Sequence, residues 1–109
     1  MAQNFRNQIV RNTGTSGVDI LNAVDSYDTV IGIRLANVHT AAISVDVYIV
    51  RSSTNYYLVK APPIPVGGSL ELIDGGAKVV LASGDKIAAV STAANSLDTV
   101  VSYIDTIST

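Results

Sequence analysis

The chain has 109 residues, a net charge of −2, only 15% charged residues, one histidine and no cysteine. This length allows one domain with one core, and the absence of cysteine excludes a disulfide framework and a thiolate metal site. The seven Lys and Arg residues are scattered rather than clustered as in a nucleic-acid binder, and no apolar run approaches the ~18 residues that span a bilayer. We therefore expect neither a nucleic-acid nor a membrane partner, and no signal peptide in the polar start MAQNFRNQ.

Hydrophobic residues make up 48% of the chain, which is high for so few charges. This composition favours a protein whose surface is partly covered by neighbours. A monomer with a coat of Ser, Thr and Asn is the alternative.

Residues 1–17, MAQNFRNQIVRNTGTSG, differ from the rest, with one aromatic residue, two arginines and a Gly-containing exit. We predict an N-terminal arm here and a single β-sandwich domain over residues 18–109. The stretch NQIVRN has the length and polarity of a strand that could be added to a neighbour's sheet. A frayed terminus is the alternative.

The next segments alternate with a period of two. Residues 29–38 place Ile31, Ile33 and Leu35 on one face, and residues 43–50 place a set of four on one face: Ile43, Val45, Val47 and Ile49. This period is typical of half-buried strands. NVHTAA between them reads as a hairpin connection, which makes His39 an exposed turn residue.

RSSTN interrupts the alternation, YYLVK resumes it, and three prolines in APPIP predict a loop or a sheet edge. Tyr56 and Tyr57 are adjacent, so in a strand they point to opposite faces. We expect one to pack inward and the other to be exposed. An exposed Tyr suits carbohydrate stacking or a protein interface, whereas ordinary edge-strand filling is the alternative.

Residues 64–109 contain short apolar runs separated by turns that contain Gly. SLELI, KVVLA and KIAAV each follow a Gly-Gly, Asp-Gly or Gly-Asp signal, and LDTVVSYIDTI carries apolar residues on both faces. Such a two-sided strand is either central in a sandwich or lies at an interface. The whole pattern predicts an all-β fold, an antiparallel β-sandwich of about seven to nine short strands, with the jelly roll as one candidate topology.

No motif predicts catalysis or cofactor binding. Asp25, Asp74 and Asp85 stand beside Gly or Ser at expected turns, where a carboxylate accepts local backbone bonds. The calcium loop D-x-[DN]-x-[DN]-G, the serine elbow G-x-S-x-G and the phosphate loop are all absent from the sequence. We therefore expect no enzyme activity, no cofactor and no metal.

The order of the segments resembles the small all-β virion structural proteins of tailed bacteriophages, particularly those of marine and cyanobacterial phages. The resemblance covers nearly the whole chain and rests on turn and core residues: Asn37; Val45, Val47 and Ile49; Ile64, Pro65, Ser69 and Leu70; Gly76, Lys78 and Leu81; Ser96 and Asp98. Proteins of this kind include capsid decoration proteins, tail or neck components and fibre-associated modules. The resemblance implies a virion protein and supplies no catalytic residues.

The leading hypothesis is a non-enzymatic decoration (cement) protein on the capsid exterior, with the major capsid protein and copies of itself as partners. The residues expected to make contacts are Phe5, Ile9, Arg11, Tyr56 and Tyr57. The alternatives are a tail, baseplate or neck/fibre component, and a receptor- or glycan-binding module that uses Tyr56, Tyr57, Asp74 and Asp85.

Overall fold

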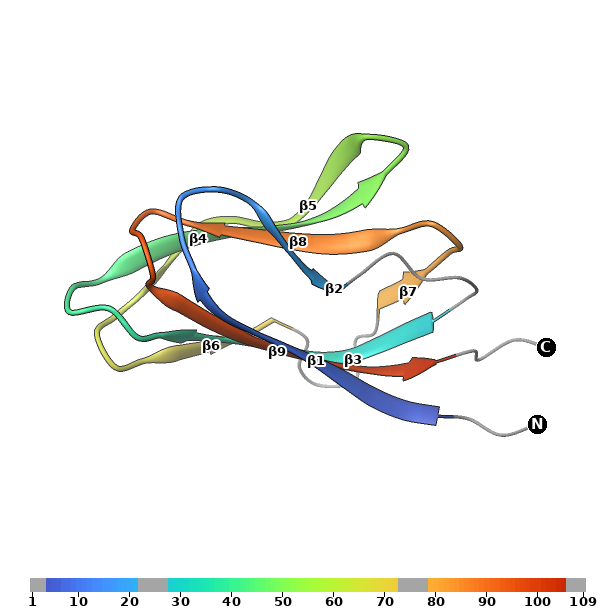
Figure 1. Cartoon of the computed structure of the whole chain (residues 1–109), viewed down its shortest axis with the longest axis horizontal. Helices are drawn as coiled ribbons and strands as arrows, with labels where there is room; N and C mark the ends of the chain where they lie inside the picture. Colours follow the sequence, from blue (N-terminus) through green and yellow to red (C-terminus); the bar gives the residue numbers. More distant parts are fainter. Residues whose placement is uncertain (1–3, 22–27, 73–78, 106–109) are drawn as a thin grey trace.

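The computed structural model describes residues 4–21, 28–72 and 79–105, which form nine strands and no helix. Figure 1 shows their arrangement. In chain order the strands are β1 (Asn4–Thr13), β2 (Val18–Leu21), β3 (Asp28–Asn37), β4 (Ile43–Arg51), β5 (Thr54–Ile64), β6 (Ser69–Glu71), β7 (Val79–Leu81), β8 (Lys86–Ser91) and β9 (Leu97–Asp105). The all-β prediction is confirmed.

The strands form two antiparallel sheets that face each other as a sandwich (Figure 1). The first sheet has the order β1-β9-β3-β6, with β7 also pairing with β3, and the second has the order β2-β8-β4-β5. The first sheet joins the two ends of the described chain, because β1 pairs with β9 from Asn4 opposite Asp105 to Thr13 opposite Leu97. The two-sided strand β9 is therefore central, between β1 and β3.

The core lies between the sheets and follows the period of two. Val45 and Val47 of β4 are buried and face residues from β3 and β9 of the other sheet, among them Ile33, Leu35 and Val101. The intervening residues of β4, such as Asp46 and Tyr48, are only half-buried. Alternate positions of one strand thus fill the core and face outward, as the sequence pattern predicts.

The N-terminal segment differs from the expected arm. Asn4–Thr13 forms β1, an edge strand of the chain's own first sheet, rather than a segment that leaves the sandwich. The strand is regular up to Val10, and a bulge then centres on Asn12, whose φ of 58° is in the left-handed region. The Asn12 N–H donates a hydrogen bond of 2.9 Å to Asp98 Oδ1 of the neighbouring strand, which holds the bulge in place.

Strand β5 forms the edge of the second sheet. Its hairpin with β4 turns on Ser52 and Ser53, both with positive φ (53° and 62°), as a two-residue type I′ connection requires. Two register shifts interrupt the pairing with β4, and at one of them Ala61 (φ 60°) donates its N–H to Asp46 Oδ1 at 2.8 Å. The prolines that follow lie on this edge, one of the two positions the sequence allowed.

Candidate functional site

The outward face of the first sheet carries exposed apolar side chains. Residues directly opposite each other in an antiparallel pair share a face. Phe5 is opposite Ile104, and Ile9 is opposite Val100. Because Val101 is buried between the sheets, its neighbours along β9 face outward. We call these four residues, Phe5, Ile9, Val100 and Ile104, the outer stripe.

Two rows of cross-strand neighbours extend from the outer stripe across the sheet. One row continues from Phe5 and Ile104 through Thr29 to Val80 of β7. The other continues from Ile9 and Val100 to an exposed ion pair, Arg34 Nε to Glu71 Oε1 at 3.2 Å. The face therefore carries two apolar rows over β1 and β9, with Val80 of β7 beyond Thr29 of β3, and it is charged where β3 meets β6.

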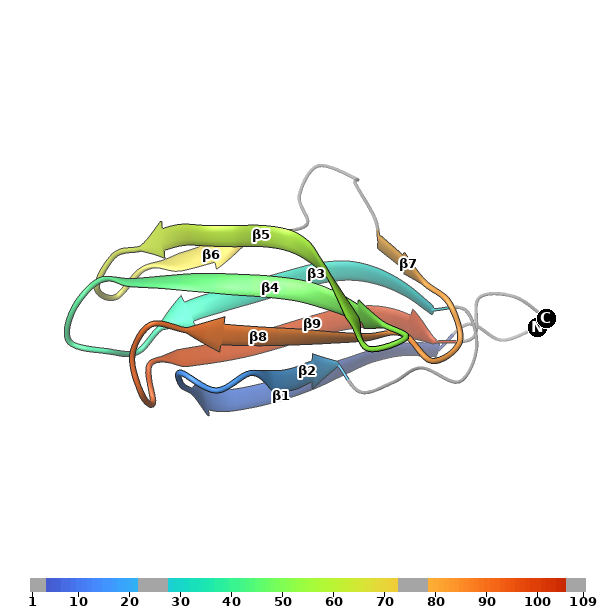
Figure 2. The same cartoon turned by 90° about the horizontal axis from the view of Figure 1, so that it is seen from above.

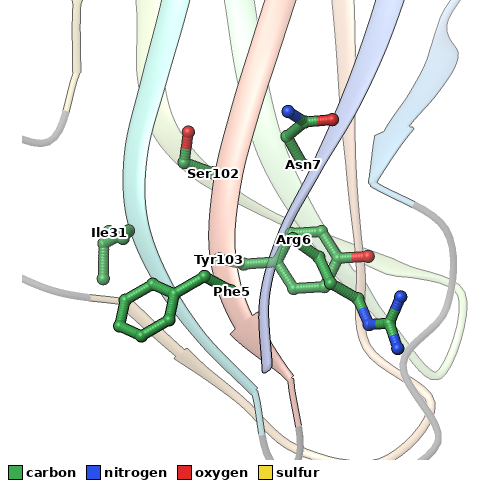
Figure 3. Close-up of a pocket in the computed structure, with 6 residues that line it drawn as sticks. All are labelled: Phe5, Arg6, Asn7, Ile31, Ser102 and Tyr103. Atoms are coloured by element: carbon green, nitrogen blue, oxygen red, sulfur yellow. The ribbon is translucent and has the colours of Figure 1, made fainter. Parts of the chain in front are cut away.

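A hollow of about 620 Å³ lies at the β1 side of this face (Figure 3). The row between the two apolar rows consists of Asn7, Ser102 and Gly32, whose side chains are shorter than their neighbours. Phe5 and Ile31 lie close together beside it (Figure 3). Arg6 and Tyr103 are opposite each other in β1 and β9 and point to the inward side of the sheet, where Tyr103 packs against the core, and they line the hollow from its edge. The hollow is open and lined by both apolar and polar groups, which suits contact with a protein surface.

Three residues of the outer stripe are exposed to an extent that is unusual for large apolar side chains: Phe5 is 71% exposed, Ile9 66% and Val100 37%. Ile104 is half-buried, and Val80, further along the same row, is 55% exposed. Of the other exposed apolar residues of the described chain, Val38 and Val66 lie in connections between strands, and Tyr56 and Tyr57 lie on β5 of the other sheet. Apolar side chains gathered on one face, rather than scattered singly, mark an interaction surface.

Three of the expected contact residues lie along β1. Phe5 and Ile9 belong to the outer stripe, and Arg11 is exposed beside the bulge at Asn12. Val80, Val100 and Ile104 were not among the expected contacts. The outward position of Val80 follows from its place between the inward residues of β7, but its place in the same cross-strand row as Phe5 depends on strand pairing.

Tyr56 and Tyr57 lie on the other sheet, and the expectation that one of them packs inward is wrong. They are 55% and 47% exposed, because the first half of β5 extends beyond the core (Figure 1). Tyr57 packs against Tyr48, with ring centroids 5.2 Å apart, and Lys60 Nζ lies 4.5 Å from the Tyr57 ring centroid. The two expected groups of contact residues, along β1 and on β5, are therefore on different sheets.

Asp85 holds a turn together. Its buried carboxylate accepts hydrogen bonds from Arg51 Nε (2.8 Å), Arg51 Nη2 (2.6 Å) and the Ala82 N–H (2.9 Å). The hydrogen bonds from Arg51 lower the pKa of Asp85, against an opposing effect of burial, and the Ala82 N–H and the Arg51 charge lower it further. This geometry gives Asp85 a structural role. Asp25 and Asp74 lie outside the described residues.

His39 lies in the connection between β3 and β4, half-buried, and its N–H donates to Asn37 Oδ1 at 2.8 Å. Within residues 4–21, 28–72 and 79–105, no three His, Asp or Glu side chains are grouped to hold a metal ion. The same part of the chain has no helix long and apolar enough to cross a membrane. The outer stripe is thus the surface feature that most needs an explanation.

Comparison of the sequence with models of known protein families finds no match, and a search of curated proteins finds no significant relative.

Proposed function

We propose that the protein is a non-enzymatic structural component of a bacteriophage particle, and within that class a decoration protein that binds the exterior of the assembled capsid. The observation that carries the binding role is the outer stripe, with Phe5 and Ile9 more than half exposed on one face of a small rigid sandwich. The phage particle itself is inferred from the resemblance of the sequence to virion proteins.

The size of the domain suits this role. A stable protein interface buries about 800 Å² per partner, and a face built from β1, β9 and β7 offers a compact surface for it. A shell repeats its binding sites many times, so even modest contacts that engage several subunits give strong attachment. The major capsid protein is the partner that this role implies.

A tail, baseplate or neck component would use the same surface at another place on the particle. The glycan-binding alternative keeps Tyr56 and Tyr57 but not Asp85, whose carboxylate is occupied by Arg51 and Ala82. Lys60 also lies over the Tyr57 ring that a sugar would stack on. We therefore favour a protein partner.

The test is binding of the purified protein to assembled capsids that lack it, measured by co-sedimentation. We expect the wild type to sediment with capsids and the double variant Phe5→Ser/Ile9→Ser to remain in the supernatant. Tyr57→Ser, on the other sheet, is the matched control and should bind like the wild type. Gold-labelled antibody on intact virions then locates the protein.

Label over the head supports the decoration role, and label confined to the tail or neck replaces it with the second candidate. Virions without label, together with capsids that do not retain the wild type, would contradict the proposal. Binding of the wild type to a glycan array, lost in Tyr57→Ser, would favour the glycan-binding module instead.

A further inference from the structure

Strand β1 is the long, unprotected edge of this molecule. In the described part of the chain it has one neighbour in its sheet, β9 (Figure 2). Edge strands present backbone N–H and C=O groups that can pair with another chain, and proteins usually limit this by keeping such strands short or by adding Pro, Lys or bulges.

The other edge strands of the sandwich have these features. Within the described residues, β6 and β7 have three residues each and β2 has four. β5 is long, but it carries Lys60, Pro62 and Pro63 and two register shifts. β1 has ten residues and no Pro or Lys; its charged residues are Arg6 and Arg11, and its bulge comes only after Val10, so Asn4–Val10 is a regular strand with one charge.

We propose that a second copy of this chain pairs with β1, antiparallel, about a two-fold axis through Asn7. The regular part of the strand is Asn4–Val10, and Asn7 is its midpoint. An axis there gives the longest overlap that stops before the bulge. It places Phe5 across from Ile9, Arg6 across from Gln8, and Asn7 across from its own counterpart.

Shifting the axis by one residue removes these favourable pairs. An axis through Arg6 sets two arginines directly opposite, which is destabilising. An axis through Gln8 sets Phe5 across from Arg11 and Ile9 across from Asn7, so both apolar cross-strand pairs are lost. The axis through Asn7 keeps both apolar pairs and sets no like charges opposite one another.

Pairing in this register joins the two outer stripes, because directly opposite residues share a face. Phe5 and Ile9 of one copy then lie beside Ile9 and Phe5 of the other on a single outward face. The dimer rests on the β1 edge and the register in which two copies of it can pair. A wider apolar face that binds a capsid is the use of this dimer that rests on the proposed function. One strand pair buries less than a standard interface, so we expect a dimer that dissociates in the micromolar range.

The first experiment is sedimentation equilibrium of the full chain over a wide concentration range. The wild type should show a monomer–dimer equilibrium. Asn7→Lys and Asn7→Asp each place like charges at the axis, and each should weaken the dimer about tenfold or more. An equimolar mixture of the two variants should recover it as a heterodimer. Ser102→Lys, on the neighbouring strand of the same face, is the control and should dimerise within about threefold of the wild type.

Cross-linking gives an independent readout, because the chain contains no cysteine. Asn7→Cys should form a covalent dimer under mild oxidation, whereas Tyr56→Cys on the exposed hairpin should not. A wild type that stays monomeric, with equal cross-linking of the two Cys variants, overturns the proposal. Undiminished dimerisation of Asn7→Lys overturns the register.

These results are separable from the proposed function. A monomer that sediments with capsids would retain the decoration role and remove the dimer. A dimer that binds no phage particle would do the reverse.

Discussion

The two outward faces of the sandwich are built from different residue types. On the second sheet, Asp46 pairs with Lys60 at 3.5 Å and Asp19 with Lys86 at 3.4 Å, and all four side chains reach solvent. On the first sheet, the outer stripe occupies the corresponding outward positions of β1 and β9. The second sheet thus carries its ion pairs beside the exposed Tyr57, whereas the first sheet exposes apolar area over β1 and β9 and has its ion pair, Arg34–Glu71, only where β3 meets β6.

This difference separates stability from association. Exposed ion pairs contribute little to the free energy of unfolding, typically about 0–1 kcal/mol each, but they keep a face hydrated. Exposed apolar side chains likewise contribute little to folding, because they remain in water. Changes on either face should therefore leave the fold intact, whereas changes between the sheets should not.

The largest effect is expected at Val47, which is fully buried between the two faces. Val47→Asp would bury a charge without a partner, and we expect a loss of about 3–5 kcal/mol in the free energy of unfolding, enough to unfold a domain of this size. Circular dichroism and denaturant titration measure it. Ile9→Asp, on the outer stripe and 66% exposed, is the control and should change the free energy of unfolding by less than about 1 kcal/mol. A folded Val47→Asp variant with the wild-type midpoint would show that the faces are assigned incorrectly.

The second effect concerns Asp85, the buried carboxylate in the turn between β7 and β8 that binds Arg51. Asp85→Asn removes the charge that Arg51 binds, and we expect a loss of about 2 kcal/mol at neutral pH. Because the folded-state pKa of Asp85 lies below that of the unfolded chain, its contribution is present above about pH 4 and is lost as the pH falls through the folded-state pKa.

The measurement for Asp85 is denaturant unfolding of wild type and Asp85→Asn from neutral pH downward. The difference between the two proteins should shrink as the pH falls below about 4. A difference that stays constant over this range would show that the ionised form of Asp85 is not what stabilises the turn.

The sequence predicted which side chains enter the core better than it predicted which strands pair with one another. The inward positions Ile33, Val45 and Val47 follow from alternation within a strand, which is a local property. Ile31 was expected on the face of Ile33 but lines the outward hollow, because a register shift between Val30 and Gly32 interrupts the alternation of β3. The pairing of Asn4 with Asp105 joins the two ends of the described chain and has no local signal. For this reason residues 1–17 read as an arm, although Asn4–Thr13 has its own place in the first sheet.

The same reason limits what the sequence says about the candidate surface. Phe5 and Ile9 stand out individually as apolar residues in a polar segment, but their position beside Val100 and Ile104 depends on the β1–β9 register. The Tyr56 prediction failed differently. Alternation fixes which way a side chain points, but not whether the opposite sheet extends far enough to cover it.

Replacing residues of the outer stripe should change stability little but should strongly reduce binding to capsids. Phe5→Ser/Ile9→Ser should change the free energy of unfolding by less than about 1 kcal/mol, because the two side chains are 71% and 66% exposed on an edge strand. It should reduce both the fluorescence of a bound apolar dye and the co-sedimentation with capsids. Tyr56→Ser/Tyr57→Ser removes exposed area of similar kind from the other sheet. Equal losses of capsid binding in the two double variants would mean that the first sheet has no special role.

The smallest effects distinguish the two members of one surface ion pair. Lys60 contributes an exposed charge, so Lys60→Ala should cost about 0.5 kcal/mol or less. Asp46 also accepts the Ala61 N–H at the β5 bulge, so Asp46→Ala should cost about 1 kcal/mol. Denaturant unfolding of both single variants and the double variant measures the two contributions. If Lys60→Ala lowers the free energy of unfolding as much as Asp46→Ala does, the ion pair itself stabilises this face. If Lys60→Ala lowers it less, Asp46 acts mainly by fixing the bulge, and the charges of the second sheet keep the face hydrated rather than stabilising the fold.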